Sequence, residues 1–258
     1  MRRLGALALV LTVAVAPPAG SADIPLDQRR SGYADLGRDT KAMQDDDTSN
    51  PATLWVQDGE ALWNQKAGGE GKACAACHGD AAASMKGAAA RYPAFSPARN
   101  GPIDLEQRIN LCRAEQQLAT PFAFESRELL ALTAYLGRQS RGMPIVQNDA
   151  RLAPAVDAGR KLFTLRIGQI DLSCAQCHDD NWGRRLAGSL VPQGHPTGYP
   201  IYRLEWQSLG SLQRRLRNCM IGMRAEPYDY GAPESVALET YLMWRARGLA
   251  VETPGVRP

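Results

Sequence analysis

The sequence predicts an all-α protein made of two tandem copies of one small domain. Three observations indicate this. One pentapeptide pattern occurs twice, the segments around both occurrences resemble each other in the same order, and the two-residue alternation of strands is weak throughout. The duplicated segments read as helices separated by loops rich in Gly, Ala and Pro. An internal duplication of this kind predicts two related domains joined by a linker.

The chain of 258 residues begins with a short apolar stretch typical of an export signal. Arg2 and Arg3 precede the apolar run 4–15, and small residues follow at 19–22. This pattern predicts a cleaved signal peptide over residues 1–22 and a periplasmic protein, because the run is too short to span a bilayer. No later stretch is apolar for long enough to cross a membrane. Removal of the signal lowers the formal charge from +3 to about +1, which argues against nucleic-acid binding.

The duplicated pentapeptide is C-x-x-C-H, present as CAACH and as CAQCH. This is the attachment pattern of c-type haem, in which the two thiols form thioethers and the histidine binds iron axially. We therefore predict two c-type haems. A zinc site or a redox dithiol is the alternative, but each half lacks the second ligand pair or the βαβ context that these need. The predicted attachment and proximal residues are Cys74, Cys77, His78, Cys174, Cys177 and His178.

The sequence predicts the same order of elements in each half: a helix, the haem motif, a loop, a helix that carries a cysteine, and a final helix. That order is the plan of an all-α cytochrome c-like domain, whose terminal helices pack together and whose haem supplies much of the apolar core. The matching segments are 58–65 with 157–166, 104–112 with 211–219, and 132–142 with 238–248.

Domain boundaries follow from this repeat. The segment 142–155 contains two prolines and scattered polar residues, and it reads as the linker. We expect an N-terminal cytochrome c-like domain over 23–148, with a polar N-terminal extension, and a C-terminal one over 149–258.

The second axial ligand of each haem iron has to come from elsewhere in the chain. Of the three histidines, only His195 is left, and we expect it to be a loop residue. Cys112 and Cys219 occupy the same repeat position and follow leucine or isoleucine at helical spacing, so both sulfurs should point toward haem. This predicts histidine–cysteine ligation of both irons. Methionine ligation, a cysteine acting as a small hydrophobe, and a Cys112–Cys219 disulfide are the alternatives.

With its two haem motifs, a cysteine on a later helix in each half and the segment RRLRNC (214–219), the chain resembles the SoxA family. SoxA is the dihaem subunit of the SoxAX cytochrome of bacterial thiosulfate oxidation. The resemblance implies an L-cysteine S-thiosulfotransferase that joins thiosulfate oxidatively to a cysteine of the carrier protein SoxYZ. It also implies a SoxX cytochrome c subunit as partner and a downstream cytochrome c that accepts the electrons.

The same resemblance implies roles for individual residues. His78 with Cys112, and His178 with Cys219, would be the axial pairs of the two haems. Cys219 would be the catalytic sulfur, which can carry an extra sulfur atom as a persulfide, and Arg215 would be the arginine beside it.

Arg215 suits an anionic substrate because it stands one helical turn before Cys219. Its guanidinium can present two parallel donors to a sulfonate, and its charge favours a thiolate over a thiol. However, Arg108 stands in the same place relative to Cys112, so both arginines could instead pair with haem propionates. Further arginines crowd the second cysteine and glutamates flank the first, which favours the second half as the anion site.

Two other functions remain open from the sequence. One is an electron-transfer cytochrome c without its own chemistry, in which cysteine ligands only set the reduction potential. The other is a haem-based sensor with a displaceable thiolate. Thiolate ligation stabilises ferric iron and lowers the potential, which disfavours a general carrier of high-potential electrons.

Overall fold

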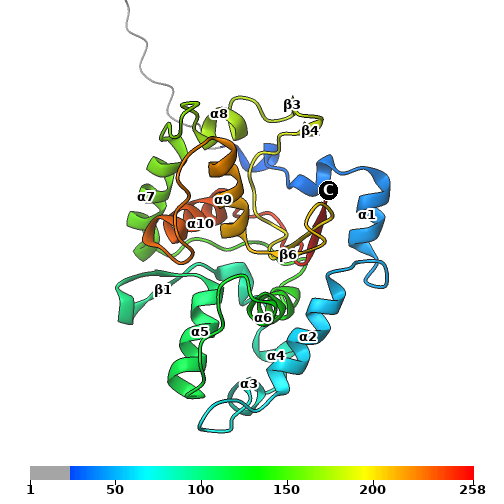
Figure 1. Ribbon diagram of the computed structural model, residues 1–258, viewed down its shortest axis with the longest axis vertical. Coiled ribbons are helices and arrows are strands. Elements are labelled where there is room, and N and C mark those ends of the chain that lie inside the picture. The colour runs from blue at the N-terminus through cyan, green and yellow to red at the C-terminus, as the bar shows by residue number, and fades with distance from the viewer. Residues whose placement is uncertain (1–23) are drawn as a thin grey trace, which may run out of the picture.

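The computed structural model describes residues 24–258, so the predicted signal peptide lies outside the described residues. Two helical halves lie one above the other, the first half at the bottom of Figure 1 and the second above it. The predicted order of helices is present in each. The first half contains α2 (Thr53–Asn64), α3 (Cys74–His78), α4 (Ala81–Ser84), α5 (Leu105–Gln116) and α6 (Arg127–Arg138). The second contains α7 (Ala153–Thr164), α8 (Cys174–His178), α9 (Leu212–Gly222) and α10 (Pro233–Arg245).

Short strands make the strictly all-α prediction wrong in detail. There are two small hairpins and a three-stranded sheet in which β5 lies between antiparallel β6 and parallel β7. Strands of two or three residues are too short to show an alternating pattern, so their pairing is decided by tertiary contacts. The strands are β1 (Ala94–Ser96), β2 (Gly101–Ile103), β3 (Arg185–Leu186), β4 (Ser189–Leu190), β5 (Ile201–Arg203), β6 (Ser208–Gly210) and β7 (Gly255–Arg257).

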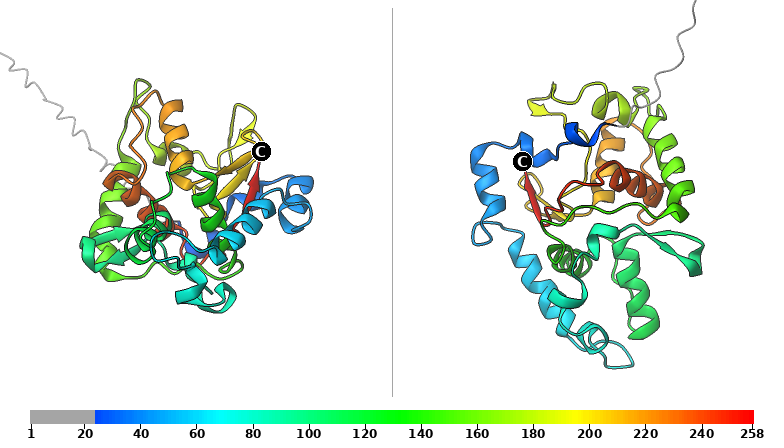
Figure 2. Two further views of the ribbon diagram at one scale, coloured as in Figure 1. Left: turned by 60° about the horizontal axis from the view of Figure 1, so that its bottom comes forward. Right: turned by 180° about the vertical axis from the view of Figure 1, so that it is seen from behind.

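The N-terminal extension packs along the second half before the chain enters the first (Figure 2). Its helix α1 (Arg38–Asp45) contacts β7, where the Gln44 side-chain oxygen accepts a 2.9 Å hydrogen bond from the backbone N–H of Val256. The linker is shorter than predicted, because α7 begins at Ala153 with a proline in its first turn, where proline is tolerated. The 3-10 turns are η1 (Leu26–Gln28), η2 (Gly32–Asp35), η3 (Ala89–Arg91), η4 (Pro97–Arg99) and η5 (Ala150–Leu152).

The first and last helices of each half cross in direct backbone contact. A Cβ atom added at Gly59 would lie 2.1 Å from the carbonyl oxygen of Ala131, and one added at Gly159 would lie 2.1 Å from that of Ala237. Only glycine permits this approach of α2 to α6 and of α7 to α10. The repeated glycine therefore explains why the terminal helices of both halves pack in the same way.

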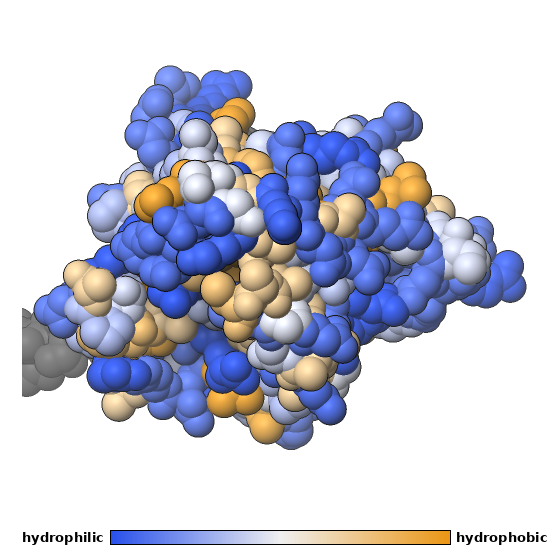
Figure 3. Space-filling model, turned by 90° about the horizontal axis from the view of Figure 1, so that it is seen from below, coloured by the Kyte–Doolittle hydropathy of each residue, from blue (hydrophilic) through white to orange (hydrophobic). Residues whose placement is uncertain are grey.

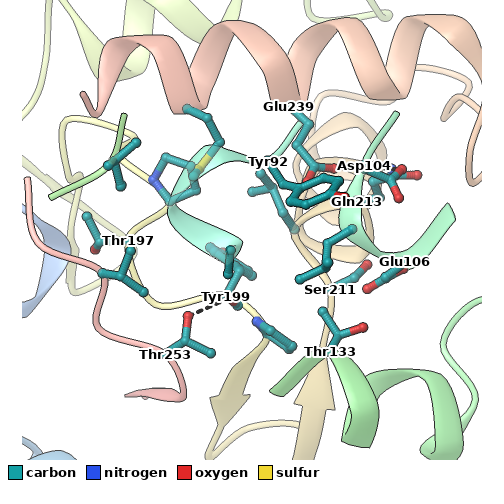
Figure 4. A pocket seen from close by; sticks show the side chains of 18 residues that line it. Tyr92, Asp104, Glu106, Thr133, Thr197, Tyr199, Ser211, Gln213, Glu239 and Thr253 are labelled. Atoms are coloured by element: carbon teal, nitrogen blue, oxygen red, sulfur yellow. Dashed lines mark hydrogen bonds between the residues drawn. The ribbon is translucent and has the colours of Figure 1, made fainter. Parts of the chain in front are cut away.

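A small cavity lies between the two halves and is lined by matching positions of each (Figure 4). Its volume is about 70 Å³. Asp104 and Glu106 reach it from the start of α5, and Glu239 reaches it from α10. Gln213 on α9 bridges two of these acids, donating to Asp104 at 2.9 Å and to Glu239 at 3.2 Å. The halves are thus joined by a polar contact that holds several carboxyl groups.

Burial sets the protonation of these carboxyl groups. It raises the pKa of Asp104 to about 6 and that of Glu239 to about 8, and it raises the pKa of Glu106 well above its ordinary value. The neighbouring carboxylate of Asp104 raises the pKa of both glutamates further. The interface therefore holds protons at neutral pH.

None of the helices within residues 24–258 combines the length and the apolar composition that a membrane span requires. Viewed from below, the end of the molecule that carries the first half is largely hydrophilic, with moderately apolar residues gathered at its centre (Figure 3).

Replacing Gly159 by Ala should destabilise the protein, by about 1–3 kcal/mol or more, because the new methyl group would collide with the backbone of α10. Urea unfolding measures the loss. Gly222→Ala is the matched control: it also lies in a helix but faces open space, so it should be neutral or stabilising by at most about 1 kcal/mol. Equal stability of the two variants would contradict the close crossing.

Glu239→Gln should flatten the dependence of stability on pH. The folded-state pKa of Glu239, about 8, lies above the ordinary 4.5, so its contribution is complete below pH 4.5 and is lost as pH rises through 8. Each pKa unit of this difference corresponds to about 1.4 kcal/mol. Denaturant unfolding at several pH values checks it, with exposed Glu234→Gln on the same helix as control. A wild-type slope retained in Glu239→Gln would argue against the buried carboxyl.

Candidate functional site: two cysteine–histidine centres

The first centre lies at the end of the molecule where α3 meets α5. Cys74 begins α3 and is half-buried, whereas Cys77 and His78 are exposed. Burial raises the pKa of the Cys74 thiol, the charge of Arg113 on α5 lowers it, and the charge of Cys112 on the same helix raises it, so Cys112 lies near the motif. The indole of Trp63 on α2 lies 5.6 Å from the His78 ring between centroids. The structure thus brings the motif and Cys112 together.

The second centre repeats this arrangement with deeper burial. Both thiols of the CAQCH motif and the sulfur of Cys219 on α9 are half-buried. Burial raises the pKa of Cys174 to about 12 and also raises that of Cys177, and in both cases the charge of Cys219 adds to the effect. Phe163 on α7 takes the place of the indole, with its ring 6.3 Å from that of His178. Cys219 therefore lies near the second motif as Cys112 lies near the first.

The position of Cys219 depends on helix α9, whose N-terminus is fixed by a cap and whose apolar face packs in the core. The Ser211 hydroxyl caps the helix by accepting from the backbone N–H of Arg214 at 3.0 Å. Leu212 and Leu216 pack into the apolar core of the second half on the face that leads to Cys219. Met220 lies next to it and is buried. The predicted apolar stripe is therefore present.

The two histidines differ in their surroundings. Nδ1 of His178 lies 2.7 Å from the carbonyl oxygen of Pro192, and since a carbonyl only accepts, Nδ1 carries the proton. This leaves Nε2 of a neutral His178 with its lone pair free. Burial lowers the pKa of His178, which favours the same neutral form. His78 makes no side-chain hydrogen bond to any residue in the range 24–258.

The three arginines around Cys219 have different roles. Arg214 lies 4.3 Å above the Trp206 ring and 3.8 Å from a carboxylate oxygen of Glu125. Arg217 donates to the carbonyl oxygen of Tyr228 and lies over another aromatic ring. Arg215 is half-buried, and its guanidinium has no hydrogen-bond or ion-pair partner within the described part of the chain. Of the three, it alone is left to meet a ligand.

A tyrosine at the matching position of each half lies near each of the two matching arginines. Burial raises the pKa of Tyr199, and the charges of Arg215 and Cys219 act on it in opposite directions. Arg108 and Cys112 act in the same way on Tyr92. Arg108, however, is exposed, whereas Arg215 is half-buried. An anion beside Arg215 would be less screened by solvent than one beside Arg108.

The structure bears on the disulfide and zinc alternatives for the cysteines and on the place of His195. All six cysteines lie in the described residues and all are free, so the Cys112–Cys219 disulfide is not formed. Within residues 24–258, no group of three or more His, Cys, Asp or Glu side chains is arranged to hold a metal ion, as a zinc site would require. His195 is buried in a loop and donates from Nδ1 to the carbonyl oxygen of Arg30 at 2.8 Å.

Sequence reasoning missed the contacts that hold His178. The Pro192 carbonyl carries no sequence signal because every residue has one. The ion pair between Asp179 and Arg245, 2.6 Å long and almost fully buried, was also missed. The matching positions of the first half are Gly79 and Gln139, so a comparison of the halves could have indicated it.

The chain is similar in sequence and fold to known proteins. The family model described as "SoxA/TsdA, cytochrome c domain" matches residues 58–145 and again 158–251. The L-cysteine S-thiosulfotransferase subunit SoxA of Pseudaminobacter salicylatoxidans is 38% identical over 90% of this chain and 82% of its own. That of Rhodovulum sulfidophilum is 37% identical over 93% and 84%. The crystal structure of SoxXA from P. pantotrophus matches with a TM-score of 0.87 at 33% identity, covering 94% of this chain and 92% of that one.

Proposed function

The chain belongs to the SoxA/TsdA cytochrome c family, and we propose from this membership that it is the SoxA subunit of an L-cysteine S-thiosulfotransferase. It conjugates thiosulfate oxidatively to a cysteine of the SoxYZ carrier, the first step of the Sox pathway of sulfur oxidation. The observation that carries the proposal is the second centre, where a free half-buried sulfur at Cys219 lies beside a haem motif and an unpartnered guanidinium.

Two c-type haems fit the donors that the chain provides. Each motif offers two free thiols three residues apart and an adjacent imidazole, and each faces a further sulfur from another helix. The unprotonated Nε2 of His178 is suited to bind a metal, because its Nδ1–H already donates to a carbonyl. Bound there, a c-type haem supplies a one-electron acceptor. Cys74, Cys77, Cys174 and Cys177 would hold the two haems covalently, with His78 and Cys112, and His178 and Cys219, as the axial pairs.

The conversion itself is an oxidation at sulfur. A sulfur–sulfur bond forms between the terminal sulfur of thiosulfate and the cysteine of the carrier, the carrier thiol loses its proton, and an electron pair is removed. Cys219 is suited to be the intermediate sulfur, as a thiolate or a persulfide, because its side chain is accessible enough to be reached yet lies against the motif. Thiosulfate would first join Cys219 through a sulfur–sulfur bond, with loss of two electrons for which bound haems would be one-electron acceptors. The carrier thiol would then attack the sulfur bound at Cys219, lose its proton and take the thiosulfonate, releasing the Cys219 sulfur as a thiolate.

Arg215 is the proposed substrate-binding residue. Thiosulfate is a dianion, and a half-buried guanidinium without a protein partner can donate two parallel hydrogen bonds to its sulfonate oxygens. Because Arg214 and Arg217 are held by aromatic rings and by oxygen atoms, they contribute positive charge but not a free donor pair. Together the three charges favour an anion at this end of α9.

We propose the partners from the family and the location from the signal pattern. The matching structure is a SoxXA complex, which supports a SoxX cytochrome c as the second subunit of a heterodimer. The carrier SoxYZ and a cytochrome c that receives the electrons are the further partners we propose. The signal pattern of residues 1–22 supports export to the periplasm.

The alternative function, electron transfer without chemistry at the cysteine, uses the same haem attachment. It would leave Arg215, half-buried beside Cys219, only the role of pairing with a haem propionate. A haem-based sensor would bind CO or NO with displacement of the thiolate. Turnover of thiosulfate with a cysteine-bearing acceptor separates the transferase from both.

Cys219→Ala should abolish thiosulfate transfer, by at least about 100-fold, while both haems stay attached, because their thioether cysteines are unchanged. Turnover with SoxYZ measures transfer, and intact mass spectrometry counts the haems and detects loss of any extra sulfur. Cys112→Ala is the matched control, changing the same position in the other half, and it should retain most of the transfer. Activity that survives in Cys219→Ala rules the mechanism out.

Arg215→Ala should raise the KM for thiosulfate by about 10–100-fold, corresponding to a lost charge-assisted pair of about 1.5–3 kcal/mol. Arg108→Ala is the matched change in the first half. It should have little effect on KM, because Arg108 is exposed and belongs to the half that does not carry Cys219. Steady-state kinetics over thiosulfate concentration give the comparison. Equal losses in the two variants would remove the substrate role of Arg215.

A further inference from the structure

The segment 24–36 of the N-terminal extension lies across the loop that follows α8, as the view from behind shows (Figure 2). Gln193 lies on this loop, and both the oxygen and the nitrogen of its side-chain amide hydrogen-bond to the N-terminal segment. Its oxygen accepts from the backbone N–H of Arg30 at 2.8 Å, and its nitrogen donates to the carbonyl of Gln28 at 3.1 Å. His195 adds the bond from Nδ1 to the Arg30 carbonyl, at 2.8 Å. Because Gln193 is only 1% exposed, these bonds are shielded from water.

The other side of the loop rests on the histidine of the second centre. The Pro192 carbonyl accepts the 2.7 Å bond from His178, and the next carbonyl, that of Gln193, accepts from Arg245 at 3.3 Å. A Cβ atom added at Gly194 would lie 3.1 Å from Cγ of His178, and this glycine has φ of +74°. The loop is therefore pressed between the N-terminal segment and the imidazole ring.

The first half has no counterpart to this arrangement. The stretch from His178 to Tyr199 is longer than that from His78 to Tyr92 by seven residues, and the loop that the segment covers lies within this longer stretch. His78 is exposed and makes no side-chain hydrogen bond to residues 24–258. The contacts between the N-terminal segment, this loop and the histidine therefore occur in the half that carries Cys219.

We propose that residues 24–36 act as a strap that positions the second histidine: through Gln193 they hold the Pro192 carbonyl on Nδ1 of His178. The proposal rests on the proposed role of His178 as an axial ligand. A carbonyl that accepts the Nδ1 proton makes the imidazole a stronger electron donor to a metal at Nε2. Stronger donation stabilises the oxidised metal, so the strap lowers the reduction potential of the second haem alone. Gln193 is a positioning residue that acts through the carbonyl and does not touch the metal.

The test is Gln193→Ala in the full-length, haem-loaded protein. Redox titration followed by absorbance and electron paramagnetic resonance should show the second haem becoming easier to reduce. The ferrous-to-ferric ratio at a fixed solution potential should rise about tenfold, equivalent to about 59 mV for a one-electron couple, with the first haem unchanged. Amide hydrogen exchange should become faster in residues 191–197.

Gln44→Ala is the matched control, because Gln44 is equally buried and also fastens the N-terminal extension, but to β7 rather than to the loop. It should lower stability without moving either potential. If Gln193→Ala yields no folded protein, His195→Ala removes one strap contact and should give a smaller shift in the same direction. Unchanged potentials together with faster exchange of residues 191–197 would overturn the strap proposal.

A separate variant distinguishes failure of the strap from failure of the ligand assignment. His178→Ala should change the spectrum of the second haem. If it does and Gln193→Ala does not move the potential, only the strap is wrong. If His178→Ala leaves the spectrum unchanged, His178 is not the ligand, and both the assignment and the strap proposal fall.

Discussion

Both candidate centres depend on a helix crossing in which glycine lets two backbones touch. α2 crosses α6 at Gly59 and α7 crosses α10 at Gly159, and in each case a carbonyl oxygen occupies the space of the missing side chain. The crossing sets Trp63 or Phe163 beside the imidazole of the motif that follows. Because close-packed interiors transmit displacement instead of absorbing it, the place of each histidine is fixed by this contact.

On this shared framework the two halves have diverged in ways that suit different tasks. The second motif has a capping box, formed by Ser173 and Gln176, whereas the cap position of the first is an alanine without a side-chain bond. The second also has the buried pair of Asp179 and Arg245 beside its histidine. These additions fix and bury the centre where Cys219 lies. A reactive sulfur benefits from such support, because catalytic groups act efficiently only when their geometry is held.

The contact between the halves combines apolar packing, such as Leu130 with Leu209, and a polar cluster. Gln213 is the second residue of α9, the helix that carries Cys219, and its side chain donates a hydrogen bond to Asp104 of the other half. Glu239 lies on α10, which also provides Arg245 to the second centre. The helices of the second centre are thereby held to the first half through carboxyl groups whose protonation depends on pH. The structure joins the two halves into one body through the same helices that build the site.

The sequence alone determined the repeated helices, the haem motifs and the matching places of Cys112 and Cys219, since covalent spacing and helical periodicity are local properties. It also pointed to Arg215, and it favoured that residue over Arg108 only through the charges of their neighbours in the sequence. Only the tertiary structure decided which arginine is half-buried and unpartnered, that the two cysteines do not pair, and that a carbonyl from a distant loop orients His178. Burial and hydrogen bonding between segments far apart in the chain depend on how the segments meet in space, and no local pattern encodes them.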